Sequence, residues 1–396
     1  MTVSRALAPF GTTIFTTISK LALEHQAVNL GQGFPDFDGP DFVKEAAARA
    51  IRDLPNQYAP MPGVPALRQA IARRFERDTG LAANPDTQVT VTAGCTEAIA
   101  ATLLGLCNPG DEVVLFEPFY DSYRACVAMA GCVARVVSLR HDGPAAEPGA
   151  FSFDPAALAA AFSSRTRAVL LNTPHNPTGK VFTRAELDQI AALCIQHSCV
   201  AIADEVYERL LFEPDRLPHI SIAALPGMAD RTVTLSSLGK TFSLTGWKIG
   251  WAIAPPELTA GLRAAHQFLT FAVATPLQHA AAEALAREGE YVPSLVADLA
   301  RNRLALGTAL ANLGFGVSWP AGTYFICADH TAISRRLGLE GDAAFCMHLI
   351  EKIGVAAIPP SVFYEHPELG RPLVRFAFCK KAATIDEGLR RLAKLA

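Results

Sequence analysis

The chain has 396 residues, half of them hydrophobic and 18% charged, with a formal net charge of −3. This length allows a large core and two or three domains. The slightly negative net charge argues against a nucleic-acid-binding surface. The sequence contains no run of 18 apolar residues, so we expect no membrane span. A small-molecule partner is the resulting expectation.

The nine cysteines are an odd number, form no CxxC pair and share no zinc-type spacing with histidines. We therefore expect reduced thiols and no metal site. The N-terminus is poor in acidic residues up to Glu24, as transit peptides are, but it continues directly into sequence typical of folded protein. A cytoplasmic location is the resulting prediction.

From about residue 86 to 255, short β-branched runs alternate with helical patterns. Such alternation predicts an α/β fold with a mostly parallel sheet covered by helices. The expected strands lie in residues 88–94, 111–118, 133–139, 167–174, 199–207, 232–237 and 248–255, with helices at 95–107 and 184–198. Ligands of such sheets bind beyond the carboxyl ends of the strands, so the residues there are the candidates for chemistry.

The flanking parts of the chain follow other patterns. Residues 140–155 read as a surface loop before a helix, and residues 268–286 as a buried or interface segment. A helix from about residue 291 precedes strand-like segments at 323–329 and 374–380, with another helix near 342–353. These last elements predict a second, smaller α/β domain.

The first strand ends at Gly94, and a helix begins near Cys95 and Thr96. Free backbone N–H groups and the helix dipole favour an anion there, although many such turns bind nothing. Tyr120 follows the next strand and could offer a flat face to a planar ring or simply pack. Asn176 lies in a rigid turn, "NTPHNPTGK", whose ordinary explanation is turn chemistry.

Later strand ends carry charged residues in apolar surroundings. Asp204 ends a nearly all-apolar run, where a carboxylate needs a partner such as a protonated pyridine nitrogen or a buried cation. Tyr207 follows three residues later. Lys240 stands between Ser237 and Lys248, and a buried lysine amine becomes partly neutral and can form a Schiff base.

Arg375 lies in an apolar strand and requires a carboxylate from the protein or from a substrate. Each of these features has an ordinary structural explanation when taken alone. Together they provide for a phosphate, a flat ring, a pyridinium nitrogen, a ring oxygen and an aldehyde carbon. These are the parts of pyridoxal phosphate.

The whole chain resembles the class I aminotransferases of fold type I, in the branch of methionine aminotransferase and kynurenine aminotransferase (glutamine transaminase K). The motifs that carry the resemblance are "GTTIFTTIS", "NLGQGFPDFDGPDF", "NQYAPMPGVPALRQAIA", "NTPHNPTGKVF", "DEVYE", "GKTFSLTGWKIGW", "GTYF", "AIPPSVFY" and "VRFAFCK". The resemblance implies a large domain with a mostly parallel seven-stranded sheet covered by helices, and a smaller α/β domain from both chain ends. We place an N-terminal arm and part of the small domain at 1–45, the large domain at 46–290 and the small C-terminal domain at 291–396.

The resemblance also implies roles for the candidate residues. Catalytic roles fall to Lys240, which forms the Schiff base and moves the proton, and to Asp204 and Tyr207. The implied cofactor-binding residues are Tyr58, Gly94, Cys95, Thr96, Tyr120, Asn176, Asp204, Tyr207, Ser237, Lys240 and Lys248. The implied substrate-binding residues are Phe15, Gly33, Asn176, Phe271 and Arg375, with Arg375 clamping the α-carboxylate. Tyr58 resembles the tyrosine that reaches the neighbouring subunit's phosphate, which implies a homodimer with shared active sites.

Substrate preference is expected from two departures within this branch. Thr96 and Ala272 stand where kynurenine-preferring relatives carry an aromatic residue and a histidine, and no second arginine for an acidic side chain is evident. We therefore expect methionine and other unbranched or aromatic amino acids as donors and a 2-oxo acid as acceptor. Kynurenine transamination, a β-lyase reaction on cysteine conjugates and a non-catalytic binding role stay open as alternatives.

Overall fold

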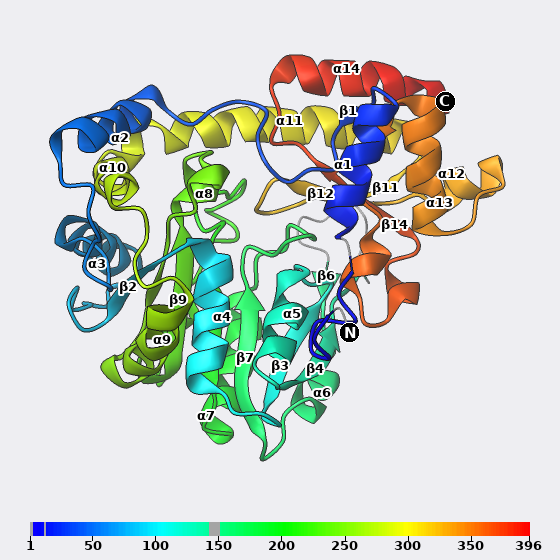
Figure 1. Ribbon diagram of the computed structural model, residues 1–396. Helices are drawn as coiled ribbons and strands as arrows, with labels where there is room; N and C mark the ends of the chain where they lie inside the picture. Colours follow the sequence, from blue (N-terminus) through cyan, green and yellow to red (C-terminus); the bar gives the residue numbers. More distant parts are fainter. Residues whose placement is uncertain (1–2, 12, 142–150) are drawn as a thin grey trace.

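The computed structural model describes residues 3–11, 13–141 and 151–396. Its central feature is the predicted seven-stranded sheet, and the α/β fold class is confirmed (Figure 1). The strands are β2 (Val89–Thr92), β3 (Glu112–Glu117), β4 (Val133–Ser138), β7 (Thr166–Asn172), β8 (Val200–Asp204), β9 (Thr232–Ser237) and β10 (Gly250–Ile253), in the spatial order β2-β10-β9-β8-β7-β3-β4. Strand β10 runs antiparallel to both of its neighbours, β2 and β9, and the other neighbouring pairs are parallel.

Strand periodicity explains how the sheet is covered on both faces. Leu170 packs with residues of α4 and α9, whereas the next residue, Leu171, packs with residues of α7 on the opposite face. The covering helices are α4 (Gly94–Leu106), α5 (Ser122–Met129), α6 (Pro155–Ala160), α7 (Arg184–Gln196) and α9 (Pro256–Leu269). Helix α7 begins with a capping box in which Thr183 and Glu186 satisfy each other's backbone N–H groups.

A second layer lies above the carboxyl ends of these strands. Its antiparallel sheet has the order β11-β12-β14, and β1 pairs with β13, so segments near both ends of the chain meet there (Figure 1). The elements are α1 (Ile14–Glu24), β1 (Val28–Asn29), β11 (Gly316–Ser318), β12 (Phe325–Asp329), α12 (Thr331–Leu337), α13 (Gly341–His348), β13 (Val355–Ala356), β14 (Leu373–Ala377) and α14 (Ala382–Leu392). A π-helical turn, Leu349–Ile353, continues α13.

The remaining helices are α2 (Asp41–Asp53), α3 (Pro65–Thr79), α8 (Leu238–Thr241), α10 (Thr275–Ala286) and α11 (Val292–Asn312). Of these, α2, α3 and α10 lie at the β2 side of the large sheet, α8 directly follows β9, and α11 links the two layers (Figure 1). Helix α11 crosses the top of the molecule from α10 to the second layer (Figure 1). The predicted domain boundary after residue 45 falls within α2, and the one after residue 290 falls just before α11. The domain limits stay predictions.

Two other expectations concern segments of the chain outside these layers. The ends of the expected loop at 140–155 pair as β5 (Arg140–His141) with β6 (Phe151–Ser152), and its middle, 142–150, lies outside the described residues. The segment 268–286 covers the end of α9 and all of α10. Its beginning is exposed in the single chain, with Phe268 86% accessible, and its role in an interface stays a prediction.

Candidate active site

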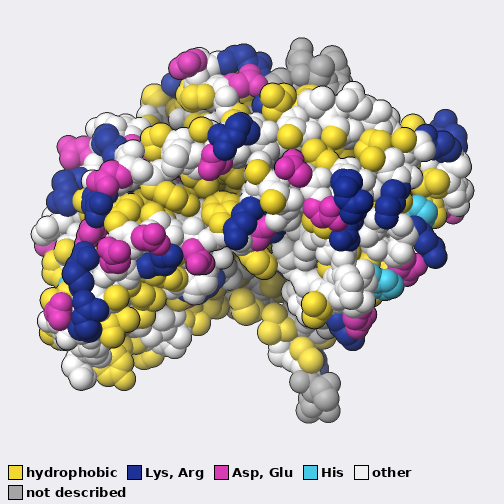
Figure 2. Space-filling model, turned by 90° about the horizontal axis from the view of Figure 1, so that it is seen from above, with side chains coloured by type: hydrophobic (Ala, Val, Ile, Leu, Met, Phe, Trp, Pro, Cys, Tyr) yellow, Lys and Arg dark blue, Asp and Glu magenta, His cyan; other side chains and the backbone are white. Residues whose placement is uncertain are grey.

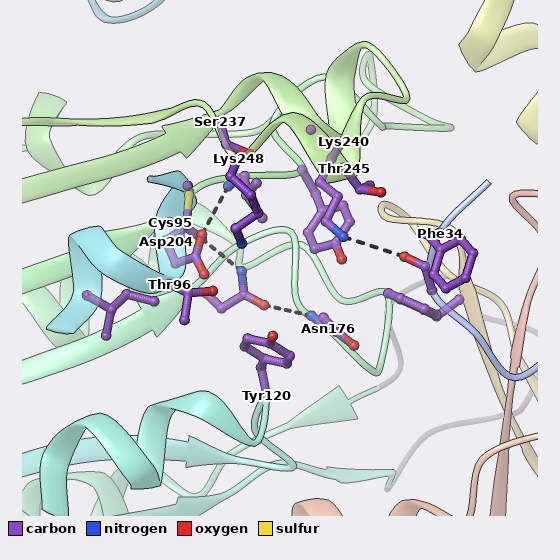
Figure 3. Close-up of a pocket in the computed structure, with 18 of the residues that line it drawn as sticks. Phe34, Cys95, Thr96, Tyr120, Asn176, Asp204, Ser237, Lys240, Thr245 and Lys248 are labelled. Carbon is purple, nitrogen blue, oxygen red and sulfur yellow. Dashed lines mark hydrogen bonds between the residues drawn. The ribbon is translucent and has the colours of Figure 1, made fainter. Parts of the chain in front are cut away.

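A cavity of about 250 Å³ lies where the carboxyl ends of the large sheet's strands face the second layer (Figure 3). It brings together nearly all residues that the sequence predicts for a site. These are Phe15, Gly33, Gly94, Cys95, Thr96, Tyr120, Asn176, Asp204, Tyr207, Ser237, Lys240, Lys248 and Arg375. The strands deliver them because successive strands end at one edge.

One end of the cavity is built to hold an anion. Gly94 begins the 13-residue helix α4 with φ +78°, and the first turn of this helix, with its free backbone N–H groups, lines the cavity. A Cβ atom on Gly94 would lie 3.2 Å from Nζ of Lys248, a tight contact, and the positive φ of this residue also favours glycine. Ser237, the last residue of β9, lines the same end. The N-terminus of α4, the ammonium of Lys248 and the hydroxyl of Ser237 thus lie at the same end of the cavity, where they can bind an anion.

Asp204 is a buried carboxylate with no cationic partner. It is 4% exposed and accepts hydrogen bonds from Tyr123 Oη at 2.7 Å and from the N–H of Val206 at 3.3 Å. No ion pair joins it to a side chain in the part of the chain that the structure describes. Burial, reinforced by the negative charge of Glu208, raises the pKa of Asp204 to about 6. A protonated nitrogen in the cavity would compensate this charge.

Lys240 lies on the short helix α8, and its amine is enclosed. Nζ lies 3.5 Å from the carbonyl oxygen of Gly33 and 5.7 Å from the ring centroids of both Tyr207 and Tyr324. Burial lowers the pKa of Lys240, and Lys248 adds to this effect. The neutral, nucleophilic fraction of this amine is therefore larger than that of a solvated lysine.

Two asparagines link Asp204 to the far end of the cavity. Asn172 donates from Nδ2 to the carbonyl oxygen of Asp204 at 2.8 Å, and its Oδ1 accepts the backbone N–H of Asn176 at 2.7 Å (Figure 3). Oδ1 of Asn176 in turn accepts a hydrogen bond from Nη1 of Arg375 at 3.2 Å. This chain of hydrogen bonds fixes the orientation of Asn176 in the cavity lining.

Arg375 is a buried guanidinium without a carboxylate. Its side chain, on β14, is 1% exposed, Nη2 donates to the carbonyl oxygen of Gly31 at 2.8 Å, and Nε has no partner. The rings of Phe15, Phe325 and Phe363 surround it at 5.3, 4.3 and 5.4 Å. No salt bridge reaches it within the described ranges. A substrate carboxylate would supply the missing charge.

Tyr58 and Phe271 are the two predicted site residues that do not line the cavity. Tyr58 is 85% exposed and Phe271 is 43% exposed, and their rings meet edge to face at 5.5 Å. Both lie on the molecular surface near the ends of α2 and α9. Within a single chain they make no contribution to the cavity lining.

The structure adds residues that sequence reasoning did not assign to the site. Tyr123 holds Asp204, and Tyr324 donates from Oη to the carbonyl oxygen of Gly33 at 2.8 Å. Gln32, Phe34 and Phe325 line the cavity. The available signal for Tyr123 was its position three residues after Tyr120. The others come from the second layer, whose placement the local pattern did not show.

No helix in the described ranges is both long and apolar enough to span a membrane. No group of three or more histidine, cysteine or acidic side chains in those same ranges could hold a metal ion.

Comparison with known proteins agrees with this geometry. Residues 25–392 match the family model described as aminotransferase class I and II. The chain is 48% identical to the N-succinyldiaminopimelate aminotransferase of Mycobacterium tuberculosis, whose structure it matches with a TM-score of 0.94 over all of both chains. For a methionine aminotransferase of Escherichia coli the values are 41% and 0.92, also over both whole chains. Human kynurenine–oxoglutarate transaminase 1 is 40% identical over 94% of each chain.

Proposed function

This chain belongs to the class I and II aminotransferases, which use pyridoxal phosphate, and we propose that it transfers the amino group of L-methionine and similar apolar L-amino acids to a 2-oxo acid. The observation that carries the proposal is the pair of uncompensated charges in one cavity. Asp204 lacks a cation at one end, Arg375 lacks an anion at the other, and Lys240 lies in the same lining.

The described residues fit the cofactor. The first turn of α4 around Cys95 and Thr96, with Ser237 and Lys248, would hold the phosphate. Tyr120 would face the ring, and Asp204 would keep the ring nitrogen protonated. Asn176 and Tyr207 would donate hydrogen bonds to the ring oxygen. When bound, the cofactor supplies an aldehyde carbon that takes up amino groups and a ring that withdraws electrons.

The protein residues then do three things. Arg375 binds the donor's α-carboxylate through its guanidinium fork, beside Asn176 and the backbone of Gly33. The neutral amine of Lys240 takes the proton from the donor's α-carbon and returns a proton later in the reaction. Phe15 on α1 packs against the guanidinium and restricts water at this end of the cavity.

The lining supports an apolar donor side chain. Its cations are Lys240, Lys248 and Arg375, each with a role above, which leaves no further cation in the lining for a distal carboxylate. Phe34 and Phe325 offer apolar surface, and the E. coli relative is a methionine aminotransferase. The identity to the M. tuberculosis relative makes N-succinyldiaminopimelate the second candidate donor.

We further propose a homodimer in which Tyr58 reaches the partner's site. Six exposed apolar side chains gather around the ends of α2 and α9, namely Ile51, Leu54, Tyr58, Phe268, Leu269 and Phe271. Figure 2 shows hydrophobic side chains over the part of the molecule that carries α2 and α10. An apolar cluster of this kind is typical of a subunit interface. Placement of Tyr58 outside its own cavity fits a contribution in trans.

A donor panel tests the proposal. We expect cofactor-loaded enzyme and pyruvate to give a higher kcat/KM with L-methionine than with N-succinyl-L,L-diaminopimelate, L-kynurenine or L-glutamine. The reverse order for any of these three would replace methionine as donor. Pyruvate and ammonia released from a cysteine conjugate without amino transfer would instead indicate the β-lyase reaction.

A further inference from the structure

A second cavity, of about 240 Å³, lies on the opposite face of the large sheet from the active site. Helix α3, the strands β9 and β10, and the chain that follows β8 line it. It shares no lining residue with the active-site cavity. Its lining residues are therefore not explained by the aminotransferase chemistry.

Strand register brings several oxygen atoms together in this cavity. Ala203 of β8 is paired with Thr234 of β9, and the N–H of Glu205 donates to the carbonyl oxygen of Leu235 at 2.9 Å. Because side chains alternate along strands, Glu205 lies beside Thr234 and Ser236 on the face opposite to Asp204.

Half of this oxygen set has no hydrogen-bond partner. Glu208 accepts from Nη2 of Arg74 at 2.5 Å and from Oγ of Ser236 at 2.9 Å, but only through Oε1. Oε2 of Glu208, Oε1 of Glu205 and Oγ1 of Thr234 are buried and unpartnered. Glu205 and Thr234 are each 5% exposed, so bulk water does not satisfy these atoms.

The local charge balance leaves one carboxylate in excess when the imidazole of His219 is neutral. The ion pairs around the cavity join Arg74, Arg77 and Arg209 to Glu208, Glu288 and Asp78. Glu205 takes part in none of them. Within the described residues its Oε2 lies 3.1 Å from Nε2 of His219, and this contact is an ion pair when the imidazole is protonated. A buried carboxylate of this kind requires a compensating positive charge.

We propose that this cavity binds a monovalent cation, an alkali metal ion or ammonium, between Glu205 Oε1, Glu208 Oε2 and Thr234 Oγ1. Carboxylate and hydroxyl oxygens are the donors that hard cations prefer. A single positive charge matches the excess. A doubly charged ion would exceed it and would be repelled more strongly by the guanidinium of Arg74, which is paired with Glu208. Beside a neutral His219, ordered water would supply hydrogen bonds but would leave the charge of Glu205 uncompensated.

The first test is the melting temperature of the cofactor-loaded enzyme in potassium, sodium, ammonium and tetramethylammonium chloride at equal ionic strength. We expect at least one small cation to raise the Tm by about 2–5 °C over tetramethylammonium, with saturation in its concentration. The comparison among the three small ions identifies the class of ligand. An equal Tm in all four salts overturns the proposal.

Variants localise the effect. Glu205→Gln and the isosteric Thr234→Val should each abolish the cation dependence of the Tm. If Glu205→Gln does not fold, Thr234→Val alone provides the test. The control Glu365→Gln removes a surface carboxylate, 44% exposed and paired with Arg124, and should keep the response. Cation dependence that survives both cavity variants contradicts the site. So does a rubidium-soaked crystal with no anomalous peak among these three oxygens.

Discussion

Replacement of Arg375 by methionine should remove the donor's carboxylate clamp while leaving the fold intact. The guanidinium is 1% exposed and donates to Asn176 Oδ1 and Gly31 O, yet no protein carboxylate pairs with it within the described residues. Loss of a buried charge-assisted contact costs about 2–5 kcal/mol. At about 1.4 kcal/mol per factor of ten, kcat/KM for L-methionine should fall about 30-fold to several thousand-fold.

Steady-state kinetics with L-methionine and pyruvate measure this loss, and thermal unfolding of the cofactor-free variant provides the second readout. Methionine removes a guanidinium that burial disfavours but leaves two oxygen acceptors without donors, so these effects oppose each other and the Tm should change little. The control Arg303→Met removes an arginine that lies outside the cavity and is only partly buried, with its Cζ 5.2 Å from the ring centroid of Phe212. A KM and kcat/KM for Arg375→Met equal to those of the control would refute the clamp.

Three further predictions concern the other charged and interface residues. Lys240→Ala should still retain cofactor in equilibrium dialysis but lose about 10²–10⁴-fold in turnover, and near-normal turnover would exclude Lys240 as the base. Because the pKa of Asp204 is raised from 3.8 to about 6, its ionisation destabilises the cofactor-free protein by about 3 kcal/mol above pH 6 and not below pH 4. Asp204→Asn should therefore raise the Tm of cofactor-free protein at pH 8 but not at pH 4; an equal difference at both pH values would contradict this. Tyr58→Phe should weaken cofactor binding about 10-fold in dimers, and a fully active monomer would refute the shared site.

The large sheet was predictable because each strand is a short β-branched run with a clear polar end. The run before Asn172 and the run before Asp204 became β7 and β8, and their ends lie side by side in register. The antiparallel direction of β10 was not evident, because a buried strand reads the same in either direction. Chain direction depends on the connection through α8 and the turn at Lys248, whose φ of +54° no local pattern indicates.

The site residues most readily predicted from the sequence are those whose charged side chains are costly to bury, and most of the ones that were missed are aromatic. Asp204 and Arg375 stood out because a charge in an apolar strand needs a reason. Tyr324 and Phe325 read as ordinary core residues, and only the packing of β12 over the cavity gives them contacts there. The unpartnered oxygens of Glu205 and Thr234 could not be foreseen, since they depend on which neighbours fail to reach them.

The most direct test of the central claim is a single half-reaction. Purified, cofactor-loaded enzyme is mixed with L-methionine in the absence of any 2-oxo acid, while the visible absorption of the bound cofactor is followed and the released acid is identified. The account predicts stoichiometric conversion to pyridoxamine phosphate with release of 4-methylthio-2-oxobutanoate. An unchanged spectrum with L-methionine, together with full conversion by N-succinyl-L,L-diaminopimelate, would contradict it.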